Sequence, residues 1–140
     1  MATGVGVDDA VSAQFDEFKL QRAPYNLRFY TYKIEDGNIT IDTTGPREAT
    51  WDDFCENFQP GEPKYGLFDL EYETQDGRPT SKLVLLSWSP DDSNVRKKML
   101  YAGSVAALKS VLVGVTVHIT ATDASEMEVG IALDAARRFG

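Results

Sequence analysis

Apolar and polar residues along the chain repeat with two different periods, and the changes of period divide the sequence into helices and strands. Val11, Phe15 and Phe18 recur at roughly helical spacing near the amino terminus. Residues 38–44 instead alternate between apolar and polar side chains, which is typical of a half-buried strand. In this half the pattern predicts a helix that begins at Asp8 or Asp9 and ends at Pro24, followed by strands at 27–34 and 38–44 around a tight turn at 36–38. Thr50 then opens a short helix, whose inward-facing residues are Trp51, Phe54, Cys55 and Phe58. Two further strands, at 65–72 and 82–88, are joined around 76–79.

The second half contains the longest helical pattern. Residues 83–86 are apolar on both faces of the predicted strand, which indicates a central strand covered by helices on both sides. Farther along, Tyr101, Val105, Leu108 and Leu112 step i, i+4, i+7, i+11 along one face of a helix. The pattern predicts this helix at about 94–112, a last strand over the alternating residues 115–120, and a closing helix from 122 or 123 to about 138.

The predicted order is therefore helix, hairpin, helix, hairpin, long helix, strand and helix. This order favours an α/β (α+β) fold, in which a central mixed β-sheet of five to six strands is sandwiched between helices. The length of 140 residues fits one domain, and no internal repeat or low-complexity linker divides it. We predict a single domain over residues 1–140, with residues 1–7 as a flexible N-terminal tail.

Composition adds a prediction about the compartment. The apolar fraction of 42% is close to that of an ordinary globular domain, so the fold needs no disulfide. Cys55 is the only cysteine, which excludes an internal disulfide and suits a reducing compartment. The amino terminus lacks the features of a secretory signal, and no segment reaches the roughly 18–20 apolar residues of a membrane span. These features predict a soluble cytoplasmic protein.

Charge changes the expected partner. The chain has 14 basic and 22 acidic residues and a net charge of −8, which argues against nucleic acid as a partner because polyanions attract basic surfaces. Basic residues nevertheless gather at Arg96, Lys97 and Lys98, and again at Arg137 and Arg138. Such a cluster can face an acidic partner, or it can be a solvated helix face. Charge alone leaves both interpretations open.

Residues that support catalysis or bind metals are sparse. His118 is the only histidine, and its alternating position predicts a solvent-facing strand residue. Cys55 lies among aromatic residues, which favours a small buried hydrophobe over a nucleophile. One histidine and one cysteine exclude a zinc site of the usual ligand types. The acidic pairs at 52–53 and 91–92 stand at helix starts, where carboxylates are stabilising, and no glycine-rich phosphate loop is present. The sequence predicts neither an enzyme nor a cofactor or metal site, and favours a binding module.

Several short segments resemble one known family. Residues 3–9 are similar to a Ser-Gly-Val-x-Val tail, and residues 65–72 to a Tyr-Ala-x-Phe-Asp-x-Glu-Tyr strand. Residues 88–91 match a Trp-x-Pro-Asp turn, and residues 95–102 are similar to the start of a long helix. Residues 112–115 and 121–123 resemble the segments that follow that helix. In this order and over essentially the whole chain, they resemble the actin-depolymerizing factor (ADF)/cofilin family. The resemblance implies the ADF-homology fold and actin as partner.

The resemblance also implies a surface for actin monomers, formed by the N-terminal tail and the first half of the long helix. The matching positions are Gly4, Val5, Arg96, Lys98 and Met99. Arg96 and Met99 are i, i+3 neighbours on one helix face, whereas Lys98 lies about 200° around the helix from Arg96 and must reach in from the flank. The alternatives are ordinary core packing for Met99 and a solvated side chain for Lys98.

A second surface, implied by the same resemblance, contacts a neighbouring subunit in the filament. Lys82 and Arg138 match its basic positions. Thr80 and Ala135 stand where the family has charged residues, and these departures bear on filament affinity and severing more than on monomer binding. Basic residues near this surface that could compensate are Arg78 and Arg137.

The expected function is binding to monomeric and filamentous actin, with filament severing and depolymerisation; the alternative is a coactosin-like filament-side binder that does not sever. Thr3 matches a phosphorylated serine of the family, and a phosphate there would oppose docking. Phosphoinositides are a further implied partner, through Arg96, Lys97 and Lys98. We expect a monomer in the cytoplasm and at the cytoskeleton, without a membrane span.

Overall fold

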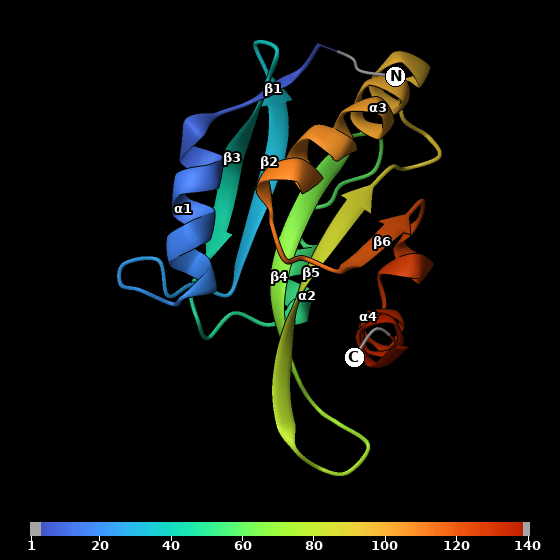
Figure 1. Cartoon of the computed structure of the whole chain (residues 1–140). Coiled ribbons are helices and arrows are strands. Elements are labelled where there is room, and N and C mark those ends of the chain that lie inside the picture. Colours follow the sequence, from blue (N-terminus) through green and yellow to red (C-terminus); the bar gives the residue numbers. More distant parts are fainter. Residues whose placement is uncertain (1–3, 139–140) are drawn as a thin grey trace.

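The computed structural model describes residues 4–138 and contains a six-stranded sheet with helices on both of its faces (Figure 1). The strands are β1 (Gly6–Val7), β2 (Phe29–Glu35), β3 (Asn38–Gly45), β4 (Lys64–Glu73), β5 (Pro79–Trp88) and β6 (Val117–Ala121). The helices are α1 (Asp9–Lys19), α2 (Trp51–Cys55), α3 (Val95–Val111), the short 3-10 helix η1 (Ala124–Met127) and α4 (Val129–Arg138).

The sheet is mixed. Its strands lie in the order β1-β3-β2-β4-β5-β6. The four central strands pair antiparallel, whereas β1 runs parallel to β3 at one edge and β6 runs parallel to β5 at the other. The predicted mixed sheet of five to six strands between helices is therefore confirmed.

Two hydrophobic cores lie on opposite faces of this sheet. One is built with α1 and α3, and the other with α2 and α4. Strand β5 supplies both cores, because successive side chains of a strand point to opposite faces. Leu85 joins the α1–α3 core, while Val84 and Leu86 join the α2–α4 core. The interpretation of residues 83–86 as a strand covered on both sides is confirmed.

The first helix ends earlier than its sequence pattern predicts. Helix α1 stops at Lys19, ahead of Pro24. Gln21 adopts a left-handed φ of 53°, and its side-chain amide donates to the carbonyls of Phe18 (2.8 Å) and Leu27 (3.3 Å). A left-handed residue with side-chain hydrogen bonds to the last carbonyls ends a helix, so Gln21 rather than Pro24 sets the boundary.

The closing helix is also interrupted. The sequence predicts one continuous helix from 122 or 123, but the structure has η1 followed by α4. Asp123 accepts a hydrogen bond from the Ser125 amide (2.9 Å), and Glu128 has extended backbone angles (φ −65°, ψ 140°) between the two helices. Among the helices of residues 4–138, none combines the length and the apolar character that crossing a bilayer requires.

The last two residues of the predicted N-terminal tail form a strand. Gly6 and Val7 form β1 and pair with Asn38 and Ile39, so the flexible tail predicted for residues 1–7 does not extend to its last two residues. The Asp8 amide donates to the Ile39 carbonyl (2.9 Å), which continues the attachment into α1. A two-residue strand has no periodicity to detect, which explains why the sequence pattern missed it.

Candidate partner-binding surfaces

Helix α3 presents an apolar stripe to solvent. Val95 is 70% exposed and Met99 is 69% exposed, and Ala102 and Ala106 are exposed farther along the helix. These four residues step i, i+4, i+7, i+11, so they share one face. The opposite face contains the fully buried Leu108. Because soluble proteins rarely leave large apolar side chains aligned in water, this outer stripe is a candidate docking surface.

Several hydrogen bonds fix the helix with this stripe outward. Asn94 caps α3 by accepting from the Arg96 amide (2.8 Å) and the Lys97 amide (3.3 Å). The Tyr101 hydroxyl accepts from the Ile34 amide (2.9 Å), and the Tyr65 hydroxyl donates to the Tyr101 carbonyl. These bonds join the first half of α3 to β2 and β4 below it.

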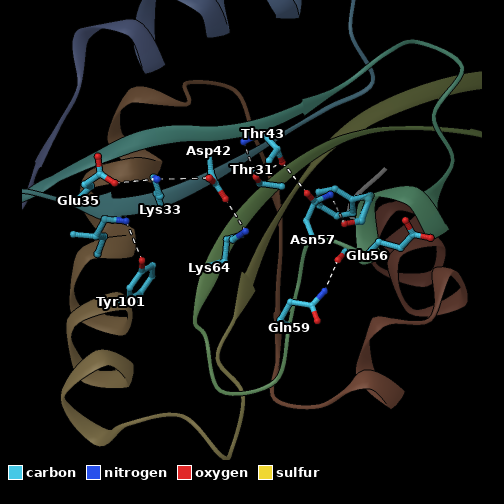
Figure 2. A network of polar contacts seen from close by, with 12 residues as sticks. Thr31, Lys33, Glu35, Asp42, Thr43, Glu56, Asn57, Gln59, Lys64 and Tyr101 are labelled. Atoms are coloured by element: carbon cyan, nitrogen blue, oxygen red, sulfur yellow. Dashed lines mark hydrogen bonds and ion pairs between the residues drawn. The ribbon is translucent and has the colours of Figure 1, made fainter.

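A charged network continues this attachment across the sheet (Figure 2). Asp42 on β3 binds Lys64 of β4 at 2.6 Å and Lys33 of β2 at 3.7 Å. Lys33 also binds Glu35 at 2.9 Å. Figure 2 shows Tyr101 of α3 beside this row of side chains. The network places alternating charges under the start of the helix, where they hold three strands together.

The basic residues of α3 occupy different positions around the helix. Arg96 is exposed next to the outer stripe, and Lys98 is half-buried on its other flank. Lys97 binds Glu62 at 3.1 Å. The exposure of Met99 excludes the alternative in which it packs in the core. The structure therefore brings Arg96, Lys98 and Met99 together around one outward surface.

The described part of the tail lies beside this surface. Strand β1 contacts α3 (Figure 1). Val5 packs partly against the α1–α3 core, and Gly4 is exposed with a φ of +78°, a conformation that favours glycine. The predicted phosphorylation site Thr3 lies outside the described residues and stays a prediction.

A second candidate surface lies at the other end of the molecule. The β4–β5 hairpin extends past the body of the sheet near α4 (Figure 1), and a hollow of about 490 Å³ lies between them. Thr80, Lys82 and Arg137 line this hollow. The Arg137 guanidinium lies 5.9 Å from the centre of the Tyr72 ring, a cation–π contact that positions it there. Arg138 is exposed at the end of α4.

Arg78 does not reach this hollow. It binds Asp76 at 2.7 Å in the hairpin turn. Ala135 is only 8% exposed and packs in the α2–α4 core, so it is not a surface position that lacks a charge. Of the two residues considered as compensation for Thr80, only Arg137 shares its surface.

His118 differs from its prediction. It is half-buried rather than solvent-facing, and its Nε2 is 2.9 Å from the Ser87 hydroxyl. Cys55 packs against the core on the other face of the sheet, so the two residues do not meet. Burial, with a smaller effect of Asp52, raises the pKa of the Cys55 thiol to about 11. A thiol of this kind stays protonated at neutral pH and is a poor nucleophile.

The burial of His118 predicts a pH dependence of stability. Burial, and secondarily Lys109, lowers the pKa of His118 below its usual 6.5. The unfolded chain then binds a proton that the folded chain resists, so stability is present above 6.5 and falls as pH drops towards the folded-state pKa. We expect urea unfolding midpoints to fall between about pH 7.5 and about pH 5.5. Because the chain has no other histidine, a His118→Gln variant should show a smaller fall; an equal fall in both proteins would contradict the assignment.

Comparisons with known proteins agree with this architecture. The family model described as "Cofilin/tropomyosin-type actin-binding protein" matches residues 4–136. The chain belongs to the ADF/cofilin family. An actin-depolymerizing factor of Lilium longiflorum is 39% identical over 132 residues, which cover 93% of both chains. The crystal structure of Streptomyces griseoflavus cofilin has a TM-score of 0.85 and 30% identity, and covers 96% of this chain and 98% of its own. Human coactosin-like protein, at 13% identity and a TM-score of 0.79 over 100% of this chain and 93% of its own, shows the shared fold alone.

Within this ADF/cofilin chain, the prediction from sequence missed part of the outer stripe. It included Met99 but not Val95, Ala102 or Ala106. The signal was available, because these residues repeat with the same i, i+4, i+7, i+11 steps as the inward residues. Only one apolar face of α3 packs in the core, so the second apolar face stays exposed to solvent.

Proposed function

We propose that this chain binds actin monomers and the sides of actin filaments, and promotes filament severing and depolymerisation. The observation that carries the proposal is the outer stripe of α3, flanked by Arg96 and Lys98, in a chain that the ADF/cofilin family model spans from residue 4 to 136. The curated relative from Lilium longiflorum is named an actin-depolymerizing factor, which supports the same function here.

The monomer-binding surface consists, in this proposal, of Gly4, Val5, Arg96, Lys98 and Met99. Met99 is flexible and exposed, so its side chain can adapt to an apolar cleft on the partner. Arg96 and Lys98 flank the stripe and can pair with acidic groups around that cleft. An interface of roughly 1,200–2,000 Å² in total is sufficient for specific binding.

The filament-binding surface consists of Lys82 and Arg138, to which we add Arg137 because it lines the same hollow as Lys82. Binding at both surfaces would join two neighbouring subunits in one preferred arrangement and shift the population of filament conformations. Breakage then follows at boundaries between decorated and bare filament, without covalent chemistry.

Co-sedimentation with actin filaments tests the function. At high speed, we expect the protein to pellet with filaments while additional actin appears in the supernatant as protein concentration rises. Pelleting without released actin would instead favour the coactosin-like alternative. A protein that stays in the supernatant, leaves the filaments intact and does not bind monomers would overturn the proposal.

Removal of the flanking charges should weaken monomer binding. For Arg96→Ala with Lys98→Ala we expect about a tenfold higher Kd for monomeric actin, and a smaller difference from wild type at high salt because screening reduces both affinities. Fluorescence titration of labelled monomers at low and high salt measures the Kd and its salt dependence. Lys19→Ala with Lys109→Ala is a matched control, since it removes two exposed lysines outside the first half of α3: Lys19 ends α1, and Lys109 lies in the last turn of α3. Equal effects of both double variants would show that net charge rather than position matters.

The second surface should act on filaments alone. We expect Lys82→Ala with Arg137→Ala to raise the Kd for filaments, measured by co-sedimentation, by about three- to tenfold, while the Kd for monomers stays unchanged. Arg78→Ala is the control on the same hairpin, because Arg78 is already bound to Asp76. A loss of monomer binding in the first variant would contradict the separation of the two surfaces.

Three further properties belong to the proposal. Phosphoinositides bind through Arg96, Lys97 and Lys98, the protein acts as a monomer, and it works in the cytoplasm at the cytoskeleton. Phosphorylation of Thr3 would add about −1.5 to −2 charges beside the monomer-binding surface and oppose docking; an unchanged actin affinity of Thr3→Glu would exclude that role.

A further inference from the structure

Lys97, the middle residue of the basic run, is turned away from the outer stripe. It precedes Met99 by two residues and therefore lies about 200° around the helix axis from it. Its Nζ lies 3.1 Å from Glu62 Oε2 and 3.3 Å from Oε1, so both carboxylate oxygens face the ammonium group. Lys97 thus points to the body of the protein, towards the segment that joins α2 to β4.

That segment is also tied at two points to the stretch of chain that leads from the end of β5 into α3. The indole nitrogen of Trp88, at the end of β5, donates to the Gln59 carbonyl at 2.9 Å. The Gly61 amide donates to the Asp92 carboxylate at 2.9 Å, just before α3 begins. With the Lys97–Glu62 pair, the contacts hold residues 59–62 along the entrance of the helix. Two of these three ties involve a side chain next to or within the first turn of α3.

We propose that the Glu62–Lys97 ion pair is a brace that sets the position of the first turn of α3, so that Arg96 and Met99 face the partner together. This inference rests on the proposed docking of α3 on actin. Lys97 is then a positioning residue and not a partner contact. The first turn needs such support because the end of a helix frays more readily than its interior.

A second consequence follows from the charge of Glu62. Its carboxylate lies beside the basic run and lowers the positive potential there. If long-range charge alone governed binding, replacement of Glu62 by lysine would strengthen the attraction to an acidic partner. The brace predicts the opposite, because two ammonium groups in contact repel and displace the first turn. The two explanations therefore differ in sign for the same variant.

The experiment is a charge-reversal cycle in the full chain, with the Kd for monomeric actin as the readout. We expect Lys97→Glu and Glu62→Lys each to raise the Kd by about three- to tenfold, which is the range for adjacent charges that couple. The double variant recreates the pair in reverse and should return to within about twofold of wild type. Lys97→Arg keeps the pair and should bind as wild type. Urea unfolding midpoints of all variants serve as the folding control, since both residues are at least half exposed.

Three results would overturn the brace: tighter binding by Glu62→Lys, wild-type binding by both single variants, or a double variant as weak as Lys97→Glu, which would make Lys97 a direct contact. A Met99→Asp variant measured in parallel separates this inference from the proposed function. Loss of binding by Met99→Asp with no effect of the single reversals leaves the docking surface in place and removes only the brace. Wild-type binding by Met99→Asp removes the docking surface, and the brace with it.

Discussion

A Met99→Asp variant is expected to lose actin monomer binding almost completely while remaining folded. Met99 is 69% exposed and lies at the centre of the outer stripe of α3. In the proposed complex its side chain enters an apolar cleft, where an aspartate would be buried without a partner. The cost of burying such a group, about 2–4 kcal/mol, corresponds to a rise in Kd of roughly 30- to 1,000-fold. Fluorescence titration with labelled monomers measures this loss.

The matched control is Val113→Asp. Val113 is 67% exposed, almost the same as Met99, but it lies two residues beyond the end of α3. If docking uses the first half of the helix, Val113→Asp should bind as wild type. Both variants should unfold at the wild-type urea concentration, because an exposed substitution usually changes stability by less than about 0.5 kcal/mol. An equal loss in both would extend the docking surface along the whole helix, and no loss in Met99→Asp would refute it.

The architecture was predictable from the sequence wherever burial imposed a regular pattern. The apolar run at 83–86 indicated a strand covered on both faces, and β5 does supply both cores. The inward residues of α3 were found because a long helix repeats its buried positions several times, and repetition is what makes a period detectable. Element types and the mixed sheet followed from the same patterns.

Boundaries and single side chains were harder to predict, because they depend on contacts between distant residues. The end of α1 depends on the left-handed Gln21 and its side-chain hydrogen bonds, which no apolar period records, and β1 exists only because β3 is there to pair with it. His118 alternates correctly on β6, yet it is half-buried because Ser87 and α3 lie next to it. Period alone cannot identify such neighbours.

At the candidate site, too, part of the arrangement was predictable from the sequence and part was not. Resemblance supplied Arg96, Lys98 and Met99, and the structure places them around one surface. It also separates Lys97 from them, although the four residues are consecutive in sequence. A charge run read from sequence gives its members equal roles, whereas the helix turns each one by about 100° relative to the last. Here that rotation directs Lys97 towards Glu62.

A Gly66→Ala variant is expected to destabilise the fold, although the resemblance places alanine at this position of the strand. Gly66 lies on β4, in the middle of the sheet, between Thr31 and Leu86. A Cβ there would lie 2.5 Å from the Phe54 ring and 2.6 Å from the Phe58 ring. Both rings are buried and pack edge to face at 5.0 Å, so neither can move aside without disturbing the other.

Two opposing effects decide how much the free energy of unfolding changes in Gly66→Ala. Replacing glycine by alanine restricts the unfolded chain and by itself stabilises by about 0.4–1 kcal/mol. Overpacking a well-filled core costs about 1–3 kcal/mol, so we expect a net loss of about 1–2 kcal/mol in the free energy of unfolding, measured with urea. Gly130→Ala is the control, because a Cβ there meets no atom within 4 Å beyond its chain neighbours and the backbone of its own helix, so α4 should gain or keep its stability. Stabilisation by Gly66→Ala would mean that the rings of Phe54 and Phe58 can repack, and that the alanine of the family pattern suits this chain as well.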